Sequence, residues 1–117
     1  LKLLIDEGER FDVVVVDPPA LIKRKKDLKA GEQAYHRLNQ LAIRLLNPEG
    51  ILVSASCSMH LTRDRLGEVV RVASRHVDRF TQIFYDGRQG FDHPVHPAIP
   101  ETDYLKAVFC RVVKGSA

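Results

Sequence analysis

The alternation of apolar and polar stretches along the chain predicts strands and helices in turn. Val13 to Val16 form an unbroken apolar run, which suits a strand that is covered on both faces in a parallel sheet. Other apolar residues recur at helical spacing and predict amphipathic helices. The predicted elements are the end of a helix at 1–9, strands at 11–16, 51–57, 80–85 and 104–113, and helices at 31–46 and 62–77.

Turn and capping residues set the boundaries of these elements. Gly8 ends the first helix, the polar stretch 21–29 predicts a loop, and the turn residues 47–50 end the second helix. Thr62 is placed to cap the third helix. The predicted apolar faces are Ala34, Leu38, Leu41, Ala42 and Leu45 in the second helix, and Leu66, Val69, Val70, Ala73 and Val77 in the third.

The order of the elements predicts an α/β fold. Strands and helices alternate as far as 80–85, which implies parallel strands with right-handed crossovers. No helix separates 80–85 from 104–113, so these two strands should pair antiparallel. The carboxyl ends of the first three strands and the loop 86–102 would then share one edge of the sheet. That edge would gather Asp17, Cys57, Arg88, Asp92, His93 and His96.

Asp17 stands directly between the valine run and two prolines. Pro18 and Pro19 donate no backbone N–H, so the strand must stop there and deliver Asp17 at its carboxyl end. Ligands bind at such ends in open α/β sheets. The alternative is that Asp-Pro only opens a turn.

The two cysteines differ in their sequence context. Cys57 follows the second strand between Ser56 and Ser58, where a thiol can be partly exposed and act as a nucleophile. The alternative is a buried cysteine that serves only as a small apolar group. Cys110 lies in mid-strand, which predicts a core position.

Charged residues near this edge permit a polyanionic partner. Lys23, Arg24, Lys25 and Lys26 form either a solvated loop or a phosphate-binding cluster beside the site. His93 and His96 lack further ligands and sit between prolines, so we predict no metal site.

Composition and length indicate that residues 1–117 are ordinary globular sequence, either one domain or a piece of a larger domain. The chain has 117 residues, 44% of them hydrophobic, and a formal charge of +3. It contains no apolar stretch of the roughly 20 residues that span a bilayer and no secretory signal, so we expect no membrane partner and a cytoplasmic location. Because the chain begins without methionine, inside a predicted helix, we expect a piece of a longer protein.

Several motifs in order resemble one enzyme family. Asp17-Pro18-Pro19, Ser56-Cys57-Ser58, Asp92-His93-Pro94-Val95 and Tyr104-Leu105-Lys106 are similar to the C-terminal half of large-subunit (23S) ribosomal RNA cytosine-5 methyltransferases that carry a PUA domain. The resemblance covers nearly the whole chain. It implies a class I S-adenosylmethionine-dependent methyltransferase with a partial Rossmann-like sheet that acts on ribosomal RNA.

The resemblance also implies roles for individual residues. Cys57 would add to C6 of cytosine, and Asp17 would hydrogen-bond the base near N3. Asp17 and Pro18 would also lie beside S-adenosylmethionine. The residues expected to contact substrate are Pro18, Pro19, Lys23, Arg24, Lys25, Lys26, Ser58, Arg88, Asp92 and His93.

Two departures from the family pattern matter. Pro19 stands where many such enzymes have a second cysteine, and the chain has no glycine-rich turn of the kind that holds the cofactor. We therefore expect the cofactor-binding half to lie upstream, and this chain alone to be inactive and to bind cofactor weakly or not at all. The strand at 13–16 would then have an exposed edge, which predicts a homodimer.

Two other functions stay open. An exocyclic-amine methyltransferase, such as an adenine N6 enzyme, has an acid or amide followed by Pro-Pro and an aromatic residue, but Ala20 stands at the aromatic position here. The other is a catalytically silent interaction domain, in which Asp17 is a turn residue and Cys57 belongs to the core.

Overall fold

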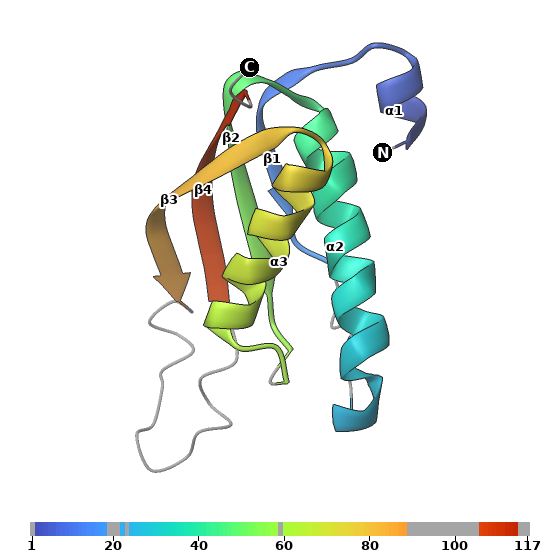
Figure 1. Cartoon of the computed structure of the whole chain (residues 1–117), viewed down its shortest axis with the longest axis vertical. Helices are drawn as coiled ribbons and strands as arrows, with labels where there is room; N and C mark the ends of the chain where they lie inside the picture. Colours follow the sequence, from blue (N-terminus) through green and yellow to red (C-terminus); the bar gives the residue numbers. More distant parts are fainter. Residues whose placement is uncertain (1, 19–21, 23, 59, 89–105, 115–117) are drawn as a thin grey trace.

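Four strands form one mixed sheet in a computed structural model that describes residues 2–18, 22, 24–58, 60–88 and 106–114 (Figure 1). The helices are α1 (Lys2–Asp6), α2 (Leu28–Arg44) and α3 (Arg63–His76), with a 3-10 turn at Lys25–Asp27. The strands are β1 (Phe11–Val16), β2 (Leu46–Ser56), β3 (Arg79–Arg88) and β4 (Lys106–Lys114).

The strand order is β1-β2-β4-β3. β1 and β2 are parallel, and β4 is antiparallel to both β2 and β3. The predicted α/β class, with a C-terminal antiparallel strand, is therefore confirmed. β4 lies between β2 and β3, an insertion that the order of elements did not predict. β3 still points the same way as β1 and β2, so the carboxyl ends of all three lie at one end of the sheet.

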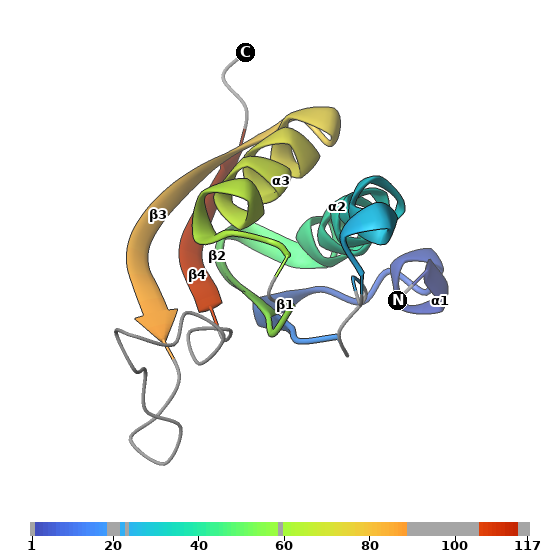
Figure 2. The same cartoon turned by 90° about the horizontal axis from the view of Figure 1, so that it is seen from below.

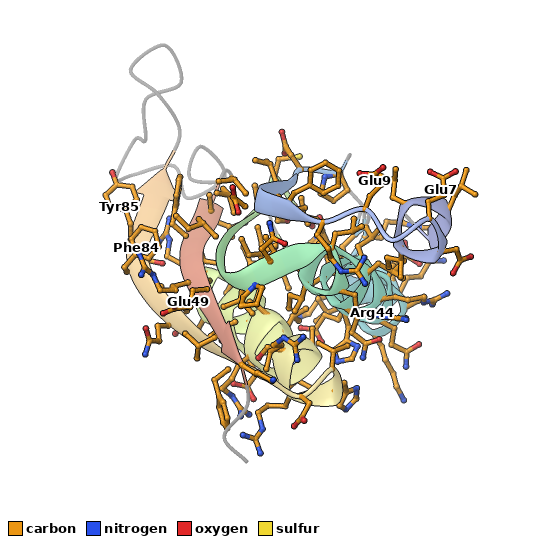
Figure 3. All side chains as sticks on the ribbon, turned by 90° about the horizontal axis from the view of Figure 1, so that it is seen from above. Glu7, Glu9, Arg44, Glu49, Phe84 and Tyr85 are labelled. Carbon is orange, nitrogen blue, oxygen red and sulfur yellow. The ribbon has the colours of Figure 1, made fainter. Side chains whose placement is uncertain are left out.

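α2 and α3 lie side by side on one face of the sheet (Figure 2). The alternation of side chains along each strand sends Val16, Leu52, Val108 and Cys110 toward these helices, and all four are buried. The opposite face carries apolar side chains that are largely exposed. Val15 is 61% exposed and Tyr85 is 59% exposed, and Figure 3 shows Tyr85 pointing away from the helices.

The buried face of α2 matches the predicted one only in part, since Ala42, and Leu45 just after the helix, are buried as predicted. Tyr35, Asn39 and Ile43 are buried, whereas Ala34 and Leu38 are only partly buried. Hydrogen bonds offset part of the cost of burying this polar pair: the Asn39 Nδ2 group donates to the Tyr35 carbonyl at 2.7 Å, and the Tyr35 hydroxyl lies 2.9 Å from the Ser56 hydroxyl. The Asn39 Oδ1 atom is buried without a partner among the described residues. A pattern of apolar residues alone could not reveal this face.

Several predicted boundaries also shift. α2 begins at Leu28 rather than 31, β3 runs on to Arg88, and β2 begins at Leu46 rather than 51. Residues 47–50 do follow α2, but they form an irregularity within β2, because Phe11 pairs with Leu46 and Val13 pairs with Ile51. The start of α3 is as predicted, since the Thr62 side chain accepts a hydrogen bond from the Arg65 N–H at 3.1 Å.

Candidate active site

Asp17 and Cys57 each follow directly after one of two neighbouring parallel strands. Val16, the last residue of β1, pairs with Ser54 in β2, so Asp17 is level with Ala55 and two residues short of Cys57 along the strand direction. Paired strands lie about 4.8 Å apart. Asp17 is exposed and Cys57 is partly exposed. The structure thus brings a carboxylate and an accessible thiol to one end of the sheet.

A buried chain of hydrogen bonds holds the turn that carries Cys57. The Ser56 hydroxyl lies 2.9 Å from the Tyr35 hydroxyl and accepts from the Ser58 N–H at 3.1 Å. The Ser58 hydroxyl in turn donates to the Ile22 carbonyl at 2.7 Å. All four residues are buried. These bonds fix the backbone on both sides of Cys57 and tie it to α2 and to the loop after β1.

Lys106 adds a charge to this network. It is only 5% exposed, and its ammonium group donates to the Ser58 carbonyl at 2.6 Å. Hydrogen bonds from an ionised donor are shorter and stronger than neutral ones, and a buried ammonium group requires such partners. Lys106 is also paired with Ser56 in the β2–β4 register. The first residue of β4 therefore supports the Cys57 turn from the neighbouring strand.

Cys110 is in a different environment from Cys57. It is fully buried in the middle of β4, as the sequence predicted. Burial, and to a smaller extent the negative charge of Asp86, raises the pKa of its thiol to about 12. Cys110 thus stays protonated and unreactive at neutral pH.

The basic loop begins at the same end of the molecule. Lys25 and Lys26 are exposed in the 3-10 turn before α2, and Arg24 is ion-paired with Asp27 at 3.1 Å. Arg88 is the last residue of β3 and pairs in register with Lys106. Pro18, partly exposed, follows Asp17. Other predicted site residues lie outside the described residues, namely Pro19, Lys23, Asp92, His93 and His96.

Neither Tyr35 nor Lys106 was singled out as a site residue from the sequence. Tyr35 lies on an amphipathic helix. The only indication of its position in the sequence is that it stands four residues before Asn39, on the same side of the helix. The sequence gives no separate signal for Lys106, which begins a strand that also contains Arg111 and Lys114. Among the described residues, no group of three His, Cys, Asp or Glu side chains could hold a metal ion, and no helix is long and apolar enough to cross a membrane.

Comparison with curated proteins finds close relatives. Ribosomal RNA large subunit methyltransferase I from Enterobacter sp. (strain 638) is 44% identical over 113 residues, which are 97% of this chain and 28% of that protein. The protein of the same name from Klebsiella pneumoniae (strain 342) is 42% identical over the same shares. The chain is homologous to one part of this methyltransferase. It spans 28% of the length of these relatives. No protein-family model matches it.

Solved structures show the same fold. SMU.776 complexed with SAH has a TM-score of 0.74 at 16% identity, covering 94% of this chain and 28% of that one. A methyltransferase homolog from Pyrococcus horikoshii has a TM-score of 0.64 at 22% identity, over 94% of this chain and 42% of that one. The resemblance to ribosomal RNA methyltransferases, and the partial methyltransferase sheet that it implied, are thus confirmed.

Proposed function

We propose that the chain forms the substrate side of an S-adenosylmethionine-dependent methyltransferase that modifies C5 of a cytosine in large-subunit ribosomal RNA. The observation that carries the proposal is the position of Cys57, a partly exposed thiol beside Asp17 at adjacent parallel strand ends. Homology to ribosomal RNA large subunit methyltransferase I supports the substrate class. The whole enzyme would act in the cytoplasm.

Cys57 is the proposed nucleophile. Its sulfur adds to C6 of the cytosine, and C5 gains the electron density that it needs to accept a methyl group. S-adenosylmethionine, when bound, supplies that methyl group. A base then takes the C5 proton, the electrons of the C5–H bond reform the C5–C6 double bond, and the C6–S bond breaks to release Cys57 as a thiolate. The fixed turn around Cys57 keeps the sulfur in place through both steps.

Asp17 is proposed to bind the same base. Its carboxyl group would hydrogen-bond near N3 and stabilise the charge that develops as the C6 adduct forms. Such contact requires that the cytosine be unstacked from the RNA. Because Asp17 is exposed at the end of β1, a flipped base can reach it.

Asp17 and Pro18 also fit one side of a cofactor site. They lie at the carboxyl end of a parallel strand, where α/β sheets bind ligands, and both retain exposed surface. The sequence offers no glycine-rich turn for the rest of that site. We therefore propose that the 117 residues alone bind S-adenosylmethionine weakly and do not turn over.

The remaining predicted contacts to RNA stay proposals, with one refinement. The Ser58 hydroxyl is buried and bonded to Ile22, so Ser58 acts by holding the Cys57 turn rather than by touching RNA. Direct contacts would come from Pro18, Pro19, Arg88, Asp92, His93 and the basic run 23–26.

The exposed edge of β1 supports one further proposal about partners. β1 ends the sheet, pairing only with β2 among the described strands, and Val13 and Val15 are 53% and 61% exposed. Bare, apolar edges recruit other strands. The isolated chain would form a homodimer through β1.

Adduct trapping tests the function. The full-length parent protein is incubated with S-adenosylmethionine and ribosomal RNA that contains 5-fluorocytosine, because fluorine at C5 blocks the release of the enzyme. We expect a protein–RNA band that survives denaturation, is absent from Cys57→Ala and persists in Cys110→Ala. Methyl transfer to normal RNA without any adduct would instead support the exocyclic-amine reaction. If neither an adduct nor methyl transfer is observed, the result would support a silent interaction domain.

A further inference from the structure

Four arginines line a cavity at the end of the sheet opposite Cys57. The cavity has a volume of about 540 Å³, and its lining includes Arg10, Arg37, Arg44, Arg79, Gln40 and His76, with no carboxylate among the described residues. It lies where α2 and α3 end and β1 and β3 begin, at the top of Figure 1. Figure 3 looks onto this end and shows Arg44 there.

The four side chains come from three separate parts of the chain. Arg37 and Arg44 lie on one stripe of α2, seven residues apart and therefore two turns apart. Arg10 precedes β1, and its guanidinium group donates to the Glu9 carbonyl at 2.6 Å. Arg79 begins β3, and its guanidinium group donates to the Asp78 carbonyl at 3.2 Å. The fold, and not a run in the sequence, makes this positive surface.

Three other surface arginines have carboxylate partners that the cavity arginines lack, whereas the exposed Arg75 and Arg111 also have no ion pair with a described residue. Arg24, Arg65 and Arg71 are each paired with a carboxylate, at 3.1, 2.8 and 2.6 Å. None of the four cavity arginines has an ion pair with any described residue. Like charges that share a concave surface repel one another, and such a surface attracts anions. The positive charge of the cavity is therefore not balanced by an ion pair with any described residue.

The ends of the helices explain only part of this cluster. The carboxyl ends of α2 and α3 carry partial negative charge, which favours cations such as Arg44 in the last turn. Arg37 lies two turns earlier, beyond the reach of that effect, and Arg10 lies on neither helix. The charge of the helix ends therefore does not account for all four arginines.

We propose that this arginine cavity binds phosphate groups of the RNA backbone, as a second contact of the RNA that reaches Cys57. The proposal rests on the proposed function for the identity of its ligand. α2 has 17 residues, so the two ends of the helix are separated by roughly 25 Å. An RNA segment of several nucleotides can span that distance. Contacts with phosphates set affinity and orientation without reading sequence.

Salt-dependent binding tests the proposal. Affinity of the full-length parent for ribosomal RNA is measured by filter binding at increasing salt, in a Cys57→Ala background so that no chemistry is required. We expect Arg37→Gln/Arg44→Gln to lower affinity about tenfold near 0.1 M salt and to reduce the slope of log K against log salt by about one to two. Arg37→Lys/Arg44→Lys keeps the charge and should keep the slope.

The matched control is Arg65→Gln/Arg71→Gln, which removes the same charge from paired arginines on α3. An equal loss of affinity in this control would overturn the proposal, because net charge alone would then explain binding. An unchanged slope in Arg37→Gln/Arg44→Gln would overturn it too. Because binding and adduct trapping are separate measurements, a missing adduct together with the expected change of slope would refute the cytosine-5 chemistry and leave the RNA site standing.

Discussion

The two ends of the sheet are built on opposite physical principles. At the carboxyl ends of β1 and β2, Ser56, Ser58 and Lys106 are buried and joined by short hydrogen bonds around Cys57. At the other end, Arg37 and Arg44 are exposed and have no ion pair among the described residues. Hydrogen bonds hold the groups around Cys57 in place, whereas the Arg37 and Arg44 side chains at the other end are exposed and are not held by ion pairs with described residues.

The difference matches two demands of RNA modification. Covalent chemistry needs a sulfur atom held to within fractions of an ångström, which buried and satisfied polar networks can provide. Holding a long polyanion needs charge that tolerates variation in sequence and conformation. Substitutions at the first end should therefore change rates, and substitutions at the second should change affinity and its dependence on salt.

The largest expected effect separates Cys57 from Cys110. With a pKa of about 12, Cys110 is only about one part in ten thousand thiolate at pH 8, and it is also buried. We expect iodoacetamide to label Cys57 at least a thousandfold faster in the folded protein, as followed by mass spectrometry. Cys57→Ser should remain unlabelled until denaturant is added. Rapid native labelling of Cys110 would contradict the assignment of the reactive thiol.

The next effect compares the two ends of a single strand. Lys106→Met removes the donor to the Ser58 carbonyl and leaves a buried acceptor unsatisfied, at a cost of about 1–3 kcal/mol. We expect the rate of adduct formation by the full-length enzyme to fall at least tenfold, with little change in KM for RNA.

The matched control is Lys114→Met, at the exposed far end of the same strand, which should leave that rate unchanged. Partial recovery in Lys106→Arg would show that the donor, rather than the volume of the side chain, matters. A rise in KM at constant kcat in Lys106→Met would contradict the positioning role.

Some features of the fold could be predicted from the sequence and others could not. The strand at 11–16 and the cap at Thr62 depend on local chemistry, so both could be predicted. The insertion of β4 between β2 and β3 depends on pairing between residues far apart in sequence, for which the chain carries no local signal. Tyr35 was missed because the partner of its hydroxyl, Ser56, lies on another element. Asn39 was missed because a pattern of apolar residues excludes it, although its amide bonds to the backbone of its own helix.

The candidate site shows the same limit. Asp17 and Cys57 could be predicted because each directly follows a recognisable strand. Lys106 could be noticed only within a motif, since its contact with Ser58 joins residues on different strands. The arginine cavity left no trace in the sequence, because Arg10, Arg37 and Arg79 are brought together only by the packing of helix ends on strand beginnings.

A smaller effect concerns self-association at the edge of the sheet. We expect the isolated chain to show a dimer mass by light scattering at high concentration, because β1 offers an apolar and unpaired edge. Val13→Glu/Val15→Glu should yield the monomer, since charges on an edge strand prevent edge-to-edge pairing. A clean monomer mass for the unmodified chain would contradict the proposed dimer.

The smallest expected effect is a pH dependence of stability. It arises at His36 on α2, which contacts His76 in the arginine cavity. The rings of His36 and His76 meet edge to face, with centroids 4.8 Å apart, and His76 lines the cavity. Burial, followed by repulsion from His76, lowers the pKa of His36 below 6.5 in the folded chain. The unfolded chain therefore takes up a proton at His36 first as the pH falls below 6.5, and acid favours unfolding.

The contribution of His36 to the free energy of unfolding is thus complete above pH 6.5 and lost as the pH falls toward the lowered pKa. Urea unfolding at pH 7.5 and pH 5.5 should show lower stability at the acid value, with a smaller difference in His36→Gln, which cannot take up this proton. An equal difference in the two proteins would assign the acid sensitivity to other groups. Because His76 belongs to the arginine cavity, bound RNA phosphates should also reduce the acid effect, by offsetting positive charge beside His36.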